Sequence, residues 1–171
     1  MPNPEPRTWN PNAAHEPGTG NMERGTTGGV DAMIGVVVVT HGQLATELVN
    51  AAETIVGDLP QFAAVSIGWH EDTEDARKEI QQAIARVHRD GGVLLVTDMF
   101  GGTPSNLAMT FLSEGAVEVL TGVNLPMLIK LANLPERADL LAAAREMREH
   151  GRNAIWVASD LLRGEKTGDR T

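Results

Sequence analysis

Two residues of the sequence, His41 and Asp98, combine side chains that can handle a phosphoryl group. His41 follows a run of valines, and Asp98 follows a second apolar run. Neutral imidazole is a good nucleophile toward phosphorus. A carboxylate bonded to one ring nitrogen fixes the tautomer and leaves the other nitrogen free to attack. If the two runs are neighbouring strands, the pair predicts a histidine that accepts and passes on a phosphoryl group.

The residues after Asp98 suit the binding of phosphate oxygens. Gly101 and Gly102 allow the backbone to approach a ligand without a Cβ clash. Thr103 followed by Pro104 is typical of a helix start, with Thr103 as the N-cap. The first turn of a helix offers unpaired N–H groups and the positive end of the dipole to an anion. We therefore expect Gly101, Gly102 and Thr103 to bind phosphate, the last also through its hydroxyl.

Other polar residues stand at comparable positions along the chain. Thr40 precedes His41 and Asn124 follows a fourth apolar run, so both are candidate contacts on the rim of the site. His70, after the second run, is a further candidate for contact with a partner. A single histidine after a strand is usually an ordinary surface residue. A catalytic role is favoured here because three loops, those that carry His41, Asp98 and Asn124, are expected at the same edge of the sheet. No functional role is expected for His15, His88 and His150.

The elements that must position these residues alternate between short β-branched runs and amphipathic stretches. This pattern builds parallel strands joined by right-handed helical crossovers. It predicts a doubly wound α/β fold with a mainly parallel four-stranded sheet flanked by helices, in which ligands bind at the carboxyl ends of the strands. Strands are expected at 34–39, 62–67, 93–97 and 117–120, and helices at about 44–57, 73–89, from 103, after 126 and at 135–150.

One further strand-like run, Ala154–Ala158, has no helical pattern after it. We expect this run to lie at an edge of the sheet or to pair with another subunit, with Trp156 as an interface anchor. The folded domain is expected over residues 33–162. The preceding residues 1–32 are expected to be a disordered extension and residues 163–171 a flexible tail. Because Met33 directly precedes the first strand, we hypothesise that it is the natural start.

Composition narrows the class of partner. The 171 residues, 42% of them hydrophobic, suffice for one domain. A net charge of −9 and the lack of any Lys or Arg run argue against nucleic acid. With no cysteine, no disulfide or thiolate metal site can form, and we expect neither metal nor cofactor. No apolar run approaches the roughly 20 residues that span a bilayer and no secretory signal is visible, so a cytoplasmic location is expected.

Three segments also give the sequence a resemblance to a known family. They are Val39–Gly42, Asp98–Pro104 with Asn106, and Gly122–Leu128. In this order and spacing they resemble the IIA component (EIIA) of the mannose family in the phosphoenolpyruvate-dependent sugar phosphotransferase system (PTS). The likeness runs over about residues 34–150.

The resemblance implies a role for several residues. His41 would take phosphate from the phosphohistidine of the carrier HPr and pass it to a histidine of an EIIB protein, while Asp98 orients the ring. Thr103, whose position is commonly Ser, would help to hold the phosphoryl group. The resemblance also implies a homodimer in which the C-terminal strand crosses to the neighbour's sheet. Contact with a membrane would come only through EIIC and EIID partners.

The sequence leaves alternatives open. A standalone regulatory EIIA, whose phosphorylation state controls what it binds, is similar in sequence to a transporting one. Gln43 and Phe100 stand where some transporting members carry Trp, which bears on partner docking. The phosphotransfer subunit of dihydroxyacetone kinase is less favoured, because its loop lacks the Gly-Gly-Thr-Pro of residues 101–104. A histidine phosphatase is disfavoured, because Thr40 replaces the arginine of its Arg-His-Gly triplet.

Overall fold

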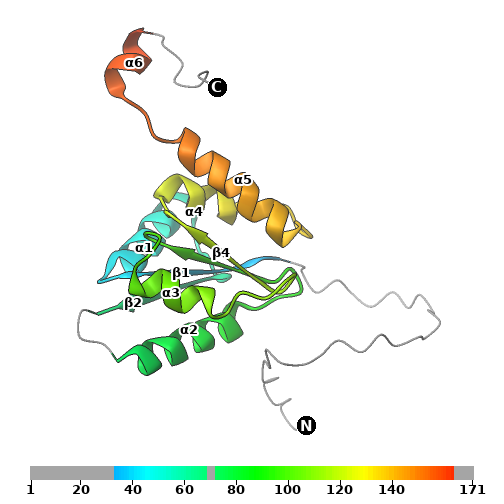
Figure 1. Ribbon diagram of the computed structural model, residues 1–171. Coiled ribbons are helices and arrows are strands. Elements are labelled where there is room, and N and C mark those ends of the chain that lie inside the picture. The colour runs from blue at the N-terminus through cyan, green and yellow to red at the C-terminus, as the bar shows by residue number, and fades with distance from the viewer. Residues whose placement is uncertain (1–32, 69–71, 164–171) are drawn as a thin grey trace, which may run out of the picture.

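A four-stranded sheet forms the centre of the structure, a computed structural model that describes residues 33–68 and 72–163 (Figure 1). All strand pairs are parallel, and the strand order is β2-β1-β3-β4. The predicted α/β fold with a four-stranded parallel sheet is confirmed. The strands are β1 (Gly35–His41), β2 (Phe62–Ile67), β3 (Val93–Thr97) and β4 (Val117–Thr121).

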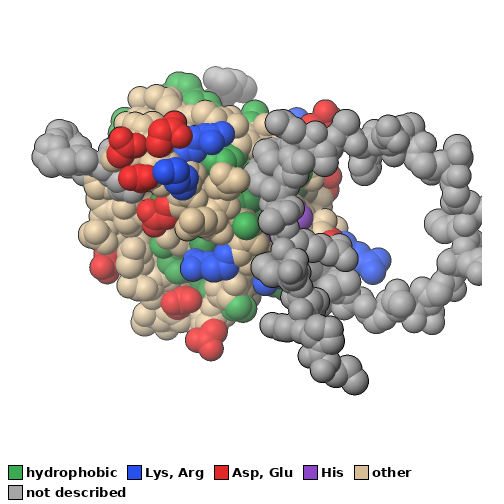
Figure 2. Space-filling view, turned by 90° about the horizontal axis from the view of Figure 1, so that it is seen from below, with side chains coloured by type: hydrophobic (Ala, Val, Ile, Leu, Met, Phe, Trp, Pro, Cys, Tyr) green, Lys and Arg blue, Asp and Glu red, His purple; other side chains and the backbone are tan. Residues whose placement is uncertain are grey.

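Helices cover both faces of this sheet (Figure 1). The α1, α4 and α5 helices pack on one face, and α2 and α3 pack on the other. The outward side of α2 carries acidic and basic side chains together and presents no patch of a single sign (Figure 2). The helices of the described residues are α1 (Leu44–Val56), α2 (Thr73–Val87), α3 (Thr103–Met109), α4 (Leu125–Ala132), α5 (Leu140–Asn153) and α6 (Ala158–Arg163). None of them is long and apolar enough to cross a membrane.

The valines of β1 explain why this strand lies inside the sheet. Val36 and Val38 belong to the apolar cluster under α1, α4 and α5, whereas Val37 and Val39 belong to the cluster under α2 and α3. Successive strand residues point to opposite faces, so a strand that is apolar at every position is stable only when both faces are covered. The strand therefore pairs on both sides, with β2 and with β3, and places His41 at the carboxyl end of an inner strand.

The α2 and α3 helices begin at the expected residues 73 and 103, each after an N-cap one residue earlier, and a third helix begins later than expected. Asp72 is the N-cap of α2, because its carboxylate accepts the N–H of Glu74 at 2.8 Å. Gly102, not Thr103, is the N-cap of α3, because its extended backbone (φ −92°, ψ 170°) precedes the first helical residue. The helix expected from residue 135 starts only at Leu140, after Asp139, whose carboxylate accepts the N–H of Ala142 at 2.7 Å.

The strand expected at Ala154–Ala158 is wrong for the described chain. The α5 helix runs through Asn153 and is capped by Ala154, and Ala158 already begins α6. Ile155 and Val157 have the β-branched side chains that favour strands, but α5 carries this segment away from the sheet, so it has no strand of its own chain to pair with (Figure 1). Exchange of the segment with a second chain stays a prediction. The expected extension 1–32 lies outside the described residues, as does the expected tail 163–171 except for Arg163, which ends α6.

Candidate active site

His41 and Asp98 meet at the carboxyl edge of the sheet. His41 ends β1 and Asp98 directly follows β3, the strand paired with β1. The ring Nδ1 of His41 lies 2.7 Å from Oδ2 of Asp98, and the backbone N–H of His41 donates to the same oxygen at 3.0 Å. Because that oxygen belongs to a carboxylate, Nδ1 is the ring nitrogen that donates a hydrogen. Nε2 is consequently the nitrogen with a free lone pair in the neutral ring.

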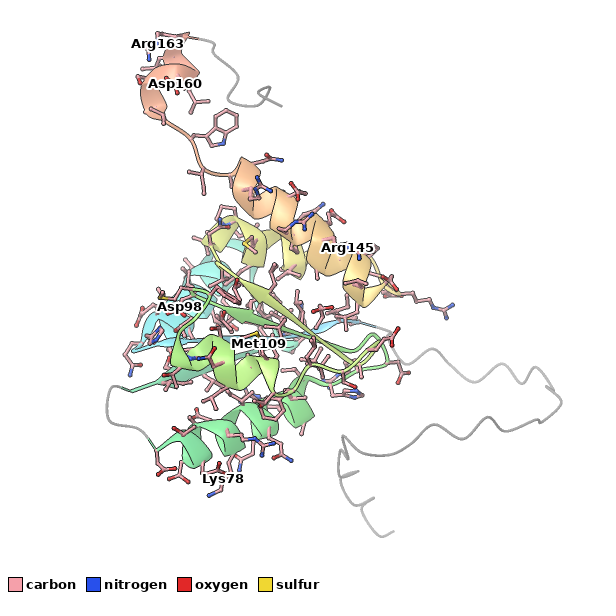
Figure 3. All side chains as sticks on the ribbon, in the orientation of Figure 1. Lys78, Asp98, Met109, Arg145, Asp160 and Arg163 are labelled. Carbon is pink, nitrogen blue, oxygen red and sulfur yellow. The ribbon has the colours of Figure 1, made fainter. Side chains whose placement is uncertain are left out.

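The carboxylate of Asp98 is held in its charged form. Partial burial works to raise the pKa of Asp98, but the hydrogen bonds from the ring and backbone of His41, the charge of His41 and the N–H of Met99 outweigh it, so the pKa lies below its ordinary value. The Asp98 side chain is only 15% exposed, whereas that of His41 is 44% exposed. Asp98 lies at the edge of the sheet near α3 (Figure 3). Because its side chain is much less exposed than that of His41, a reaction partner reaches the histidine rather than the carboxylate.

A pocket of about 580 Å³ opens beside the histidine. Its walls come from the ends of β1 and β2, the start of α2 and the start of α3, so four elements converge there. Apart from the histidine, the polar side chains among its described lining residues are two hydroxyls and one amide, and none of these residues is acidic. The lining residues are His41, Gly42, Ile67, Gly68, Thr73, Gly101, Gly102, Thr103 and Asn106.

Gly102 lies against the reactive edge of the ring. A Cβ added to Gly102 would stand 2.6 Å from Cε1 and 3.0 Å from Nε2 of His41. The first distance is shorter than a carbon atom tolerates and the second is unusually tight, so only glycine allows the two residues to approach this closely without a shift of the ring. The structure therefore places Gly102 next to the nitrogen that is free to react.

Gly101 and Thr103 take different positions in the same turn. Gly101 has a left-handed backbone (φ +85°), and its N–H donates to the hydroxyl of Ser105 at 3.0 Å. That N–H is thus engaged within the protein. Thr103 is exposed and lines the pocket with its neighbour three residues on, Asn106. Sequence reasoning missed Ser105, and its signal was a serine in the first turn of a helix, where side chains commonly bond to nearby backbone.

The two candidate rim residues lie away from the pocket lining. Thr40 is fully buried, and its hydroxyl donates to the carbonyl of His41 at 3.3 Å. Asn124 is the N-cap of α4: its oxygen accepts the N–H of Met127 at 3.2 Å, and its amide donates to the carbonyl of Gly151 at 3.0 Å. These contacts give both side chains structural roles. His15 and His70 lie outside the described residues.

A second hollow, of about 520 Å³, lies at the opposite end of the sheet. Asp90 and Gly91 precede β3, and Val117 begins β4, so this hollow borders the amino ends of the strands. Ligands of doubly wound sheets bind at the carboxyl ends. The pocket at His41 is therefore the candidate active site.

Known proteins match the chain over most of its folded part. The EIIA-Man family, described as the PTS system fructose IIA component, matches residues 35–147. The PTS system fructose-specific EIIA component of Bacillus subtilis (strain 168) is 28% identical over 139 residues, which are 81% of this chain and 95% of that protein. The PTS system mannose-specific EIIAB component of Escherichia coli (strain K12) is 29% identical over 127 residues, 71% of this chain and 39% of that longer protein.

Solved structures share the fold. The mannose/sorbose-specific IIA subunit from Enterococcus faecalis has a TM-score of 0.66 and 25% identity, with 73% of this chain and 94% of that chain covered. The PTS IIA protein associated with the fucose utilization operon from Streptococcus pneumoniae has a TM-score of 0.68 at 23% identity, with 76% and 96% covered. The family match spans β1 through most of α5 and includes the whole candidate site. The chain therefore belongs to the mannose family of EIIA components of the phosphotransferase system.

Proposed function

We propose that His41 is the phosphoryl carrier of this EIIA component: it accepts phosphate from phospho-HPr and donates it to a histidine of an EIIB protein. The contact of 2.7 Å between Nδ1 of His41 and Oδ2 of Asp98 carries the proposal. It leaves Nε2 free beside a pocket whose described lining residues include no acidic side chain, so a phosphoryl dianion meets no repelling charge from these residues.

The bonds and charges of this transfer balance with the side chains of His41 and Asp98 and the donor phosphohistidine. The lone pair of Nε2 attacks phosphorus, the N–P bond of the donor phosphohistidine breaks, and its electron pair returns to the donor's ring nitrogen. The hydrogen on Nδ1 of His41 stays in place, so the phosphorylated ring is cationic. The adjacent Asp98 carboxylate stabilises this cation. Transfer to the acceptor histidine runs the same step in reverse from His41.

The start of α3 supports the phosphoryl group in this proposal. Gly102 borders Nε2 and Thr103 presents a hydroxyl to the pocket. Unpaired N–H groups in a first helical turn bind phosphate oxygens. Because the N–H of Gly101 is bonded to Ser105, the part of Gly101 is to give the turn its left-handed conformation, and binding falls to Gly102 and Thr103.

We propose sugar uptake as the process that this transfer serves, because the relatives are named as fructose-, mannose- and sorbose-specific components. The protein would act in the cytoplasm and meet the membrane through EIIC and EIID partners.

A homodimer completes the proposal. The apolar side chains of Ile155, Trp156 and Val157 are between half and three-quarters exposed, which is unusual for a segment without a partner. β4 is an edge strand, and in the described chain its outer side pairs with no other strand and forms only an isolated bridge between Val117 and Ser113. Such an edge accepts a strand from a second copy.

Labelling at a single histidine tests the carrier role. The protein is incubated with phosphoenolpyruvate, enzyme I and HPr, and the phosphorylated residue is located by mass spectrometry. We expect label on His41 in the wild-type protein and none in His41→Ala, with an unchanged circular dichroism spectrum. His150→Ala is the matched control, because His150 is exposed in the last turn of α5 and should leave labelling intact. Label retained by His41→Ala would refute the proposal.

A further inference from the structure

Ser105 is a buried polar residue directly behind the candidate active site. Its side chain is fully buried in the first turn of α3. The hydroxyl accepts the N–H of Gly101 at 3.0 Å and donates to the carbonyl of Gly102 at 2.9 Å. It therefore uses both its donor and an acceptor position on two consecutive residues of the turn. The sequence alone indicates no function for Ser105, and Ser105 is not among the residues that line the pocket.

The two hydrogen bonds of Ser105 hold the Gly101–Gly102 turn, which lies directly against the ring of His41. Gly102 already lies so close to Cε1 and Nε2 of His41 that no Cβ fits between them. The ring cannot retreat easily, because Nδ1 is bonded to Asp98. A shift of the turn by a few tenths of an ångström consequently changes the space on Nε2 or the orientation of the ring.

The same bonds determine which N–H groups remain for a ligand. With the N–H of Gly101 engaged by Ser105, those of Gly102 and Thr103 have no hydrogen-bond partner among residues 33–68 and 72–163. Without the hydroxyl, the Gly101 N–H and the Gly102 carbonyl lose their partners, and a turn with unsatisfied groups relaxes toward a conformation that pairs them.

We propose that Ser105 is a positioning residue for phosphoryl transfer: its hydroxyl fixes the Gly101–Gly102 turn at the distance from Nε2 of His41 at which a phosphoryl group is accepted. This inference rests on the proposed function of His41. Geometry of this kind acts on the rate of the chemical step, because a small misplacement of a group next to the reacting atom lowers the rate without weakening the encounter.

Chemical phosphorylation by phosphoramidate tests the role without a protein donor. Nε2 attacks the phosphorus of phosphoramidate, its P–N bond breaks and ammonia leaves. We expect Ser105→Ala to lower the maximal rate of His41 phosphorylation about tenfold, with an unchanged half-saturating concentration and a shifted NMR resonance of the Cε1–H of His41. Ser105→Cys, whose thiol is a weaker donor, should be intermediate.

Thr110→Val is the matched control. The Thr110 hydroxyl donates to the carbonyl of Leu107 at 2.7 Å at the other end of α3, so its loss removes a comparable bond without touching the turn. It should change neither rate nor resonance.

Ser105→Ala with a wild-type rate and an unmoved resonance would overturn the role of Ser105. If Ser105→Ala does not fold, a wild-type rate in Ser105→Cys would overturn it. Absence of label on His41 of the wild-type protein would instead contradict the proposed function, and the resonance still tests the turn.

Discussion

Nδ1 of His41 is bonded to Asp98, whereas Nε2 faces Gly102 and the pocket. The effects of Asp98 and Gly102 can therefore be tested one at a time. Asp98 is bonded to Nδ1, and in the proposed transfer it stabilises the cationic ring without contacting phosphorus. Asp98→Asn keeps an oxygen for Nδ1 but removes the charge, so we expect phosphorylation by phospho-HPr to slow by at least about tenfold. Asp98→Ala should be slower still without abolishing transfer. Rapid-quench measurement of the labelling rate checks both.

The exposed carboxylate of Asp75, which pairs with Lys78 on the surface of α2, supplies the control. Asp75→Asn should leave the rate unchanged. A wild-type rate in Asp98→Asn would mean that the charge of Asp98 plays no part in the transfer.

The lowered pKa of Asp98 also predicts a pH dependence of stability. The folded state holds the pKa of this carboxyl below its unfolded value of about 3.9, so its contribution to stability is present above that value and is lost as the pH falls through the folded pKa. Asp98→Asn should therefore be less stable than the wild type at pH 7, and the difference should shrink at about pH 3. Urea unfolding at the two pH values measures it, and a difference that stays constant would contradict the assignment.

Gly102 contributes the space beside the reactive side of the His41 ring. Gly102→Ala would place a Cβ against Cε1 and Nε2 of a ring that Asp98 prevents from moving freely. We expect phosphorylation of His41 to fall by more than about tenfold, with a shifted Cε1–H resonance.

Gly115→Ala, in the left-handed turn before β4, is a suitable comparison. It strains the backbone (φ +72°), but its Cβ meets nothing within 4 Å. It should lower stability and leave labelling intact. Equal labelling of both variants would show that the space at Gly102 is not needed.

At the scale of elements, the sequence predicts the strands and the residues at their ends well, because fully apolar runs such as Val36–Val39 are stable only inside a covered sheet. Adjacency of His41 and Asp98 required the additional fact that β3 pairs with β1, which depends on how the crossovers pack and not on local pattern. Ser105 was missed for a similar reason, since its bonds exist only after the Gly101–Gly102 turn has formed.

The wrong strand at Ala154–Ala158 illustrates the opposite error. The β-branched side chains of this segment indicate a strand, but a strand also needs an adjacent edge, and propensity contains no information about that edge. In the described chain α5 ends at Asn153 and the segment leaves the sheet.

Asn124 links two helices, and its substitution should change the stability of the fold without changing the phosphorylation of His41. It caps α4 and binds the end of α5 through the carbonyl of Gly151. Asn124→Ala loses both bonds, so we expect the free energy of unfolding to fall by about 1–2 kcal/mol. Labelling of His41 should persist, because Asn124 does not line the pocket. Urea unfolding and labelling measure the two effects. Lost labelling with unchanged stability would restore Asn124 as a contact on the rim.

At the scale of the whole molecule, the C-terminal segment and the site are independent parts. The described residues that line the pocket all lie between residues 41 and 106, whereas the exposed apolar side chains of Ile155, Trp156 and Val157 come after α5. A dimer formed through this segment would cover apolar surface that water otherwise contacts, but it would not complete the site.

Truncation after Asn153 tests this separation. We expect the wild-type protein to sediment as a dimer and the truncated protein as a monomer, because the truncation removes the exposed apolar segment and leaves the β4 edge without a strand to bind. The truncated protein should still be labelled on His41. Truncation after Arg163 is the control, since it keeps the apolar segment and should keep the dimer. A truncated protein that remains dimeric would place the interface elsewhere, and one that loses labelling as a folded monomer would show that the second copy contributes to the transfer.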